Sequence, residues 1–331
     1  MKRGILVSLF SVALAVSSHP AQAADLKIAT MRLGTSWYVF GATLYQLLKP
    51  EVPKGTRVEV IAKGGGVGNP ITVSSGKAAI GLSNVVTSKW AYDGHPDIYK
   101  GKRQNKIRAL AGGLNPVWFS ALVREDYIKK TGNDTLEKIF KSKKPVRIVM
   151  KPRGSTVPVI ADLIFDSLDT NRKAIQAKGG RILQVDPKQI PSIIRDGRAD
   201  LYLDAVPLGH PTLTEVSLTG KVRFLPLPNR TIDFLALRGL TPSVIPKTYK
   251  GQSAPTPSVD LGTLIIANAT MSEDLAYIVT KTICENADAM AKAHKAWNSF
   301  NPSTAWKPEN TGIPLHKGAI RYYREKGWLE N

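Results

Sequence analysis

Five short segments hold the residues best suited to grip a small molecule. In each, glycine or small hydroxyl and amide side chains stand at the end of an apolar run. Glycine allows close approach to the backbone, and unpaired N–H groups at such turns bind anions. Such N–H groups and side chains form hydrogen bonds to a negatively charged solute. The candidate ligand-binding residues are Gly34, Thr35, Ser36, Trp37, Tyr38, Gly66, Asn69, Ser83, Asn84, Arg153, Gly154, Ser155, Thr156, Asp204, Gly209 and His210.

Some of these residues admit more than one interpretation. Arg153 can hold a carboxylate with two parallel hydrogen bonds, and His210 can donate to a ligand. A structural loop role is the alternative for each, and a flexible surface loop is the alternative for the glycine run at 64–68. This run lacks the dinucleotide fingerprint, because Asn69 replaces its last glycine. We therefore expect no nicotinamide site.

Motifs for bond-breaking chemistry are missing from the sequence. It contains no G-x-S-x-G, no H-E-x-x-H and no P-loop, and Cys284 is its single cysteine. The histidines after residue 23 are not spaced as metal-binding pairs. We expect no catalysis, no cofactor and no metal site. A secreted enzyme on the same scaffold is the alternative.

Short apolar runs alternate with segments of helical period, which is typical of an α/β protein with largely parallel sheets. The expected strands cover residues 26–30, 57–61, 78–82, 107–112, 118–123, 146–150, 181–185, 200–204 and 261–267. The expected helices cover 39–49, 157–168 and 187–196, with one more beginning at Ser272 and a last one at Pro314. Ligands of such folds bind beyond the carboxyl ends of strands, where the candidate residues fall.

Two breaks divide the 331-residue chain. One lies near Asn115-Pro116, and the other contains Pro226 and Pro228. They predict a discontinuous lobe I of residues 24–115 and 228–331, with lobe II, residues 116–227, inserted between them. Two crossings of the chain would then form a hinge, with a cleft between the lobes.

The first 23 residues have the order of a secretory signal. Lys2 and Arg3 precede an apolar run at 5–16, and Ala21-Gln22-Ala23 supplies a cleavage site. The run is shorter than the roughly 20 residues that span a bilayer. We expect export to the periplasm and cleavage after Ala23; a buried first helix is the alternative.

The net charge of +20, which falls by two when the leader is removed, has several readings. The cations are scattered, with modest clusters at 100–108 and 141–151, and they are not interleaved with aromatic residues. We expect no nucleic-acid partner. Solvation of the surface is the favoured explanation, and attraction of an anionic solute is the alternative.

We expect the protein to be a monomer.

Several segments, in chain order, resemble the TAXI family of extracytoplasmic solute receptors associated with TRAP transporters. The likeness runs across nearly all of the chain after the leader, and its last segment is the most specific. The segments are GTSWYVFGATL at 34–44, GGGVGNPITVSSGKAAIGLSNVVTSKWAYDG at 64–94, PRGSTVPVIADLIFDSL at 152–168, IRDGRADLYLDAVPLGHPTLTEV at 194–216, IPKTYKGQSAPTPSVDLG at 245–262, VTKTICEN at 279–286 and PLHKGAIRYYREKGW at 314–328.

This resemblance implies a type II periplasmic binding protein fold, with two lobes that close on a small organic anion. Glutamate, 2-oxoglutarate or a related carboxylate is the implied ligand, and a TRAP membrane permease is the implied partner. The turns at Gly34, Asn69, Ser83-Asn84, Gly154 and Gly209 match ligand turns of the family. Trp37 and the surroundings of Ser83-Asn84 depart from it, which leaves the ligand's identity open. A receptor that feeds a signalling partner is the alternative.

Overall fold

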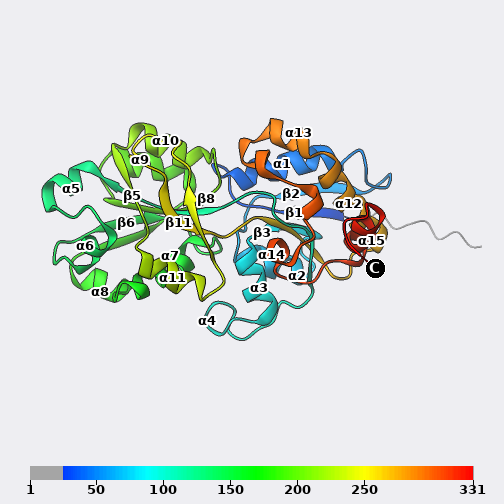
Figure 1. Cartoon of the computed structure of the whole chain (residues 1–331), viewed down its shortest axis with the longest axis horizontal. Helices are drawn as coiled ribbons and strands as arrows, with labels where there is room; N and C mark the ends of the chain where they lie inside the picture. The colour runs from blue at the N-terminus through cyan, green and yellow to red at the C-terminus, as the bar shows by residue number, and fades with distance from the viewer. Residues whose placement is uncertain (1–24, 331) are drawn as a thin grey trace, which may run out of the picture.

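The computed structural model describes residues 25–330 and contains two β-sheets, each covered by helices (Figure 1). The sheets lie in two lobes arranged along the long axis of the molecule. Lobe I contains the C-terminal helix, and lobe II contains the middle of the chain. The predicted signal peptide, residues 1–23, lies outside the described residues.

The sheet of lobe I has five strands in the order β2-β1-β3-β12-β4. Strand β1 pairs in parallel with β2 and β3, while β12 is antiparallel to β3 and β4. Every residue of β3 and β12 is buried, as expected for strands covered on both faces. The strands are β1 (Asp25–Ala29), β2 (Arg57–Ile61), β3 (Ile80–Ser83), β4 (Ile107–Ala111) and β12 (Leu264–Asn268).

The helices of lobe I come from both parts of the chain (Figure 1). Helix α12 begins at its cap Ser272, as predicted, and packs against the C-terminal helix α15. The prediction that this last helix starts at Pro314 is wrong, since His316 caps it. The helices are α1 (Ser36–Leu48), α2 (Gly68–Ser74), α3 (Val85–Asp93), α4 (Pro96–Tyr99), α12 (Glu273–Glu285), α13 (Ala287–Ala293), α14 (Pro308–Thr311) and α15 (Lys317–Glu325).

Lobe II has a seven-stranded sheet in the order β10-β11-β5-β8-β6-β7, with β9 also paired to β5. Strand β6 is parallel to β7 and β8, and the remaining pairs are antiparallel. The strands are β5 (Trp118–Arg124), β6 (Arg147–Met150), β7 (Arg181–Gln184), β8 (Leu201–Val206), β9 (Val222–Leu225), β10 (Thr241–Ile245) and β11 (Thr256–Asp260). The helices are α5 (Glu125–Thr131), α6 (Leu136–Lys141), α7 (Val157–Ser167), α8 (Arg172–Ala177), α9 (Ile190–Arg195), α10 (Pro211–Thr219) and α11 (Asn229–Ala236).

The strand order corrects the second predicted boundary. The sequence predicts that residues 228–260 belong to lobe I, but β10 and β11 belong to the sheet of lobe II, and α11 packs against α7. The prolines at 226 and 228 mark a turn inside this lobe, where the Leu227 N–H donates to the Pro257 carbonyl (3.0 Å). The chain returns to lobe I only after β11.

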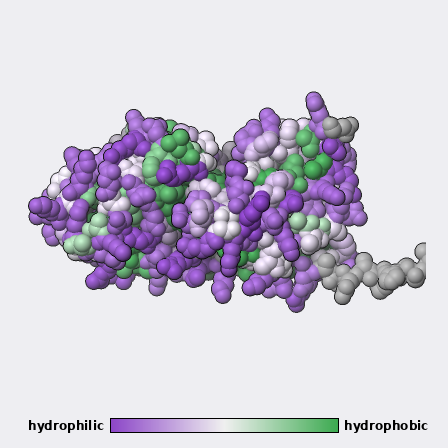
Figure 2. Space-filling view, turned by 90° about the horizontal axis from the view of Figure 1, so that it is seen from below, coloured by the Kyte–Doolittle hydropathy of each residue, from purple (hydrophilic) through white to green (hydrophobic). Residues whose placement is uncertain are grey.

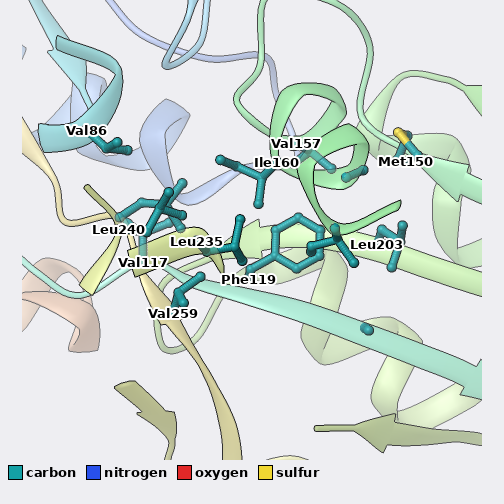
Figure 3. Packing of buried hydrophobic residues seen from close by; sticks show 14 of the residues in the cluster. Val86, Val117, Phe119, Met150, Val157, Ile160, Leu203, Leu235, Leu240 and Val259 are labelled. Carbon is teal, nitrogen blue, oxygen red and sulfur yellow. The ribbon is translucent and has the colours of Figure 1, made fainter. Parts of the chain in front are cut away.

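The two crossings run side by side as a short paired ribbon. The Leu114 N–H donates to the Thr263 carbonyl (3.1 Å), the Thr263 N–H to the Asn115 carbonyl (3.1 Å), and the Leu261 N–H to the Val117 carbonyl (2.9 Å). Apolar packing continues across this ribbon: Figure 3 shows Val86 of lobe I near Leu240 and Val117, with Phe119 deeper in lobe II. The hinge is therefore both hydrogen-bonded and packed.

Hydrophilic residues cover most of the face shown in Figure 2, with smaller apolar areas on both lobes. Among residues 25–330, no helix has the length and apolar character needed to cross a membrane.

Candidate functional site

A cavity of about 40 Å³ lies between the lobes. That is room for roughly three water molecules, so the lobes stand in a closed arrangement. Lobe I contributes Met31, Thr35, Ser36, Trp37, Gly66 and Asn84 to its walls. Lobe II contributes Lys151, Ser155, Thr156, Val157, Ala205, Pro207 and His210, and Val117 belongs to the first crossing.

The lobe I wall is built around the start of α1. The Thr35 hydroxyl caps this helix by accepting from the Tyr38 N–H (3.3 Å), and it donates to the Arg32 carbonyl (2.7 Å). Ser36 is fully buried, and its hydroxyl has no hydrogen-bond partner in the described part of the chain. A buried hydroxyl without a partner costs about 1–3 kcal/mol, and Ser36 carries this cost beside the cavity.

One side-chain hydrogen bond joins the two walls directly. The Thr156 hydroxyl donates to Asn84 Oδ1 (2.7 Å), and both residues are buried. Asn84 Nδ2 donates to the Gly262 carbonyl (2.8 Å) in the second crossing. Asn84 therefore links α3, the hinge and the start of α7.

The lobe II wall contains a buried charge. Lys151 follows β6 and is 4% exposed, and its Nζ lies 2.7 Å from Asp204 Oδ1. His210 Nε2 lies 3.2 Å from the same ammonium. Asp204 also accepts from the Ala205 N–H (2.7 Å) and from the Tyr202 hydroxyl. These bonds hold one ammonium beside the cavity, against a fully buried carboxylate.

Burial sets the titration of this network. Desolvation raises the pKa of the Asp204 carboxyl, an effect that Lys151 opposes. Desolvation also lowers the pKa of His210 well below its usual value, and Lys151 and His294 lower it further. His210 is therefore neutral at pH 7 and has one acceptor nitrogen: Nε2 accepts from the Lys151 ammonium when the proton is on Nδ1, and Nδ1 accepts from the Leu213 N–H (3.4 Å) when the proton is on Nε2.

Further contacts hold the lobes together around the cavity. The Val67 and Gly68 N–H groups donate to the Gly154 carbonyl (3.2 and 3.0 Å). The Thr212 hydroxyl donates to the Gly34 carbonyl (2.8 Å). Arg32 lies 3.4 Å from Asp186 at the surface. Gly65 sits so close to lobe II that a Cβ on it would stand 2.6 Å from the Gly154 carbonyl oxygen.

The structure brings half of the sequence-predicted residues to the cavity. Thr35, Ser36, Trp37, Gly66, Asn84, Ser155, Thr156 and His210 line it. Gly34 and Gly154 instead supply carbonyl acceptors for contacts between the lobes, and the Gly209 N–H donates to the Tyr249 hydroxyl (2.9 Å). Tyr38 is not among the lining residues.

Four more of the predicted residues also lie away from the cavity. Arg153 is exposed and lines a surface groove outside the cavity. Asp204 is fully buried behind Lys151 and does not line the cavity. Ser83 is also buried behind the wall, where its hydroxyl accepts from Ser88 Oγ (2.8 Å).

Asn69 is the fourth of these residues, and it serves as scaffold. Its Oδ1 accepts from the Gly65 N–H (3.1 Å), and its Nδ2 donates to the carbonyls of Ala29 and Thr30 (3.2 Å each) and Leu82 (2.8 Å). These bonds fix the glycine loop to β1 and β3 and leave the side chain engaged away from the cavity.

Lys151, Met31 and Val117 line the cavity but were absent from the predicted site. The position of Lys151 directly after an apolar strand was a usable signal. Among residues 25–330, no group of three or more histidine, cysteine, aspartate or glutamate side chains is arranged to hold a metal ion.

The chain belongs to the NMT1-like family, whose sequence profile matches residues 28–327. Three solved structures have a similar fold. One is MatC from Rhodopseudomonas palustris with bound malate, at 12% identity and a TM-score of 0.54, covering 94% of this chain and 98% of that one. A protein from Bordetella bronchiseptica RB50 has 15% identity and a TM-score of 0.50, covering 91% and 82%. A periplasmic transporter has 12% identity and a TM-score of 0.50, covering 93% and 95%.

These similarities, together with the two sheets and the two crossings, establish the predicted fold class. The chain has the two-lobe α/β architecture of a type II periplasmic binding protein.

Proposed function

We propose that this protein is a solute receptor of an import system, which closes its lobes on a small organic anion and breaks no bond. The observation that carries the proposal is the cavity itself, because its walls come from both lobes and include helix starts and a buried ammonium. A ligand that contacts both walls favours the closed state over the open one.

The electrostatics of the cavity favour negative charge. Helices α1 and α7, with 13 and 11 residues, both begin at it. Each helix start carries about half a positive charge and unpaired N–H groups. Lys151 adds charge on the lobe II side, although Asp204 offsets it.

The size of the cavity bears on the kind of anion. The cavity is small, about 40 Å³ in this arrangement of the lobes, which favours a small acid over a large one. We infer that the ligand is a carboxylate such as glutamate, 2-oxoglutarate or a related acid. The TAXI-like sequence motifs support this class, and the malate in MatC shows that a protein of this fold takes such a ligand.

We also propose a cellular location and a membrane partner for this receptor. The leader-like residues 1–23 and the similarity to a periplasmic transporter support a periplasmic receptor. The TAXI-like segments favour a TRAP-type permease as the membrane partner. Identifying the transport genes beside the coding sequence tests this partner.

A thermal-shift screen of acids against their neutral amides tests the function. We expect at least one acid among malate, glutamate and 2-oxoglutarate to raise the melting temperature, and its amide to leave it unchanged. At 100 times the dissociation constant, a ligand stabilises the folded state by about 2.7 kcal/mol. Equal shifts with acid and amide would contradict an anion receptor.

A further inference from the structure

His210 lies where the start of α10 meets lobe I. On one side of it, Gly209 packs so closely on lobe I that a Cβ added to Gly209 would stand 2.9 Å from Lys295 Cγ. On the other side, the Thr212 hydroxyl donates to the Gly34 carbonyl of lobe I (2.8 Å). His210 itself lines the cleft cavity and is 1% exposed. Closing the lobes therefore covers the His210 ring.

The closed contact offers no free carboxylate to a protonated His210. Asp204 is the one carboxylate among the titratable groups around the ring, and it is already bonded to the Lys151 ammonium (2.7 Å). That ammonium lies 3.2 Å from His210 Nε2, so an imidazolium would place a second cation beside it. The groups in the contact are Lys151, Asp204 and Tyr249 from lobe II, with half-buried His294 and exposed Lys295 from lobe I.

The two arrangements of the lobes differ in how readily His210 binds a proton. In the closed arrangement, desolvation lowers the pKa of His210, and Lys151 and His294 lower it further. Opening returns water to the ring and moves His294 away with lobe I, so the pKa rises back toward the ordinary value of about 6.5. The state that binds the proton more readily gains population as pH falls. Acid therefore favours the open arrangement.

We propose that His210 makes closure of the lobes sensitive to pH, because its neutral ring fits the closed contact and its protonated ring holds the lobes apart. Fewer molecules then reach the closed state in acid than at neutral pH. This regulation rests on the closure assigned to the solute receptor, but it concerns the protein without a ligand and is tested in that form.

Single-molecule energy transfer measures the ratio of closed to open molecules without any ligand. Dyes are attached at Lys54→Cys in lobe I and Lys173→Cys in lobe II, which are exposed positions, while the native Cys284 is buried. One proton bound below about pH 6.5 in the open state should lower the ratio about tenfold between pH 7.5 and 5.5. Measuring in 0.5 M salt screens the exposed ion pair of Arg32 with Asp186.

Two histidine variants assign the response to one ring. His210→Gln keeps an acceptor for Lys151 but takes up no proton, so its ratio should change less than about twofold over the same pH range. His316→Gln is the matched control. His316 is also buried, and burial lowers its pKa, but it caps α15 and does not line the cleft cavity. This variant should keep the tenfold response.

An unchanged ratio in the parent would overturn the proposal, as would an equal response in the parent and in His210→Gln. If His210→Gln fails to fold, His210→Asn takes its place, because asparagine is a favoured helix cap. No acid ligand is added, so a failed thermal-shift screen would count against the anion receptor and leave this test to decide the pH response on its own.

Discussion

Lobe I and lobe II meet the cleft in the same way, through a loop that leads from a strand into a helix. The loop before α1 brings Thr35 and Ser36, which are uncharged, whereas the loop before α7 brings Lys151. Lys151 is held by Asp204 on the neighbouring strand β8. Each lobe therefore places the N-terminus of a helix at the cleft, but only lobe II adds a charged side chain to the cavity wall. An anion should therefore bind lobe II first and attract lobe I through N–H and hydroxyl donors.

The largest effect should come from removing the buried ammonium. Lys151→Met leaves Asp204 buried without its cation, and we expect the free energy of unfolding to fall by about 3–5 kcal/mol. Urea unfolding at pH 7.5 measures it. Arg153→Met, two residues away and exposed, should cost less than about 0.5 kcal/mol. A loss below 1 kcal/mol for Lys151→Met would show that lobe II has no special dependence on this charge.

The next largest effect is expected on anion affinity when closure of the lobes is hindered. In Gly65→Ala the new Cβ would meet the backbone of lobe II, so closing becomes costly and anion affinity should fall at least about tenfold. Gly68→Ala is the control for the added methyl group, because its Cβ would lie 3.7 Å from Gly154 and clash with nothing; it does not control for the strain that φ +153° adds at Gly65. Calorimetry with the best acid from the screen compares them. Equal affinities would mean that binding does not need the closed contact.

Most of the central strands were predictable from the sequence, because uninterrupted apolar runs such as Ile148–Met150 indicate buried strands. It missed the hairpin of β10 and β11. Pro242 and Pro257 lie inside these strands, and proline lacks the N–H that strand pairing uses. No local signal states which sheet a strand joins, so the predicted second crossing lies three elements too early, before α11, β10 and β11.

In the candidate site, too, the features set by local sequence were predictable and those set by distant contacts were not. Backbone turns such as Thr35–Ser36 and Ser155–Thr156 were found, since a strand followed by a helix defines them. The different roles of Asn69 and Asn84 could not be read, because they depend on partners elsewhere in the fold. The sequence alone predicts an exposed cation at Lys151, because its pairing with the distant Asp204 is visible only in the structure.

The burial of histidine side chains also predicts a response to pH. Because burial lowers the folded-state pKa of His210, its contribution to stability is present above the unfolded value, about 6.5, and is lost as pH falls below it. His294 and His316 shift in the same direction. Each adds up to about 1.4 kcal/mol per pH unit to the slope. In unfolding measurements from pH 7 to 5, His210→Gln should reduce the slope by one proton; an unchanged slope would contradict the burial of a neutral imidazole.

A smaller effect is expected for the bond that joins the walls. Thr156→Val keeps the shape but removes the donor to Asn84, so anion affinity should fall about fivefold, or about 1 kcal/mol. The free energy of unfolding should change less than in Lys151→Met. Ser167→Ala, on the same helix but away from the cleft, is the control for calorimetry. Unchanged affinity in Thr156→Val would remove this bond from the closing mechanism.

The smallest effect belongs to the exposed ion pair between the lobes. Asp186→Asn removes the partner of Arg32, and both side chains are more than a third exposed. We expect anion affinity to change by less than about 1 kcal/mol, and the difference to vanish in 1 M salt. A larger change that persists in salt would mean that lobe I also depends on a fixed charge.

Closure of the lobes on an anion is tested most directly by measuring the distance between them. Lys54→Cys in lobe I and Lys173→Cys in lobe II place spin labels at exposed positions, and the native Cys284 is buried with its thiol pKa raised to about 12, which protects it from labelling. Double electron–electron resonance then measures the distance with and without the best acid from the screen. We predict that the acid shortens the distance in the parent and fails to do so in Gly65→Ala. An acid that binds with no change of distance in the parent would contradict closure on an anion.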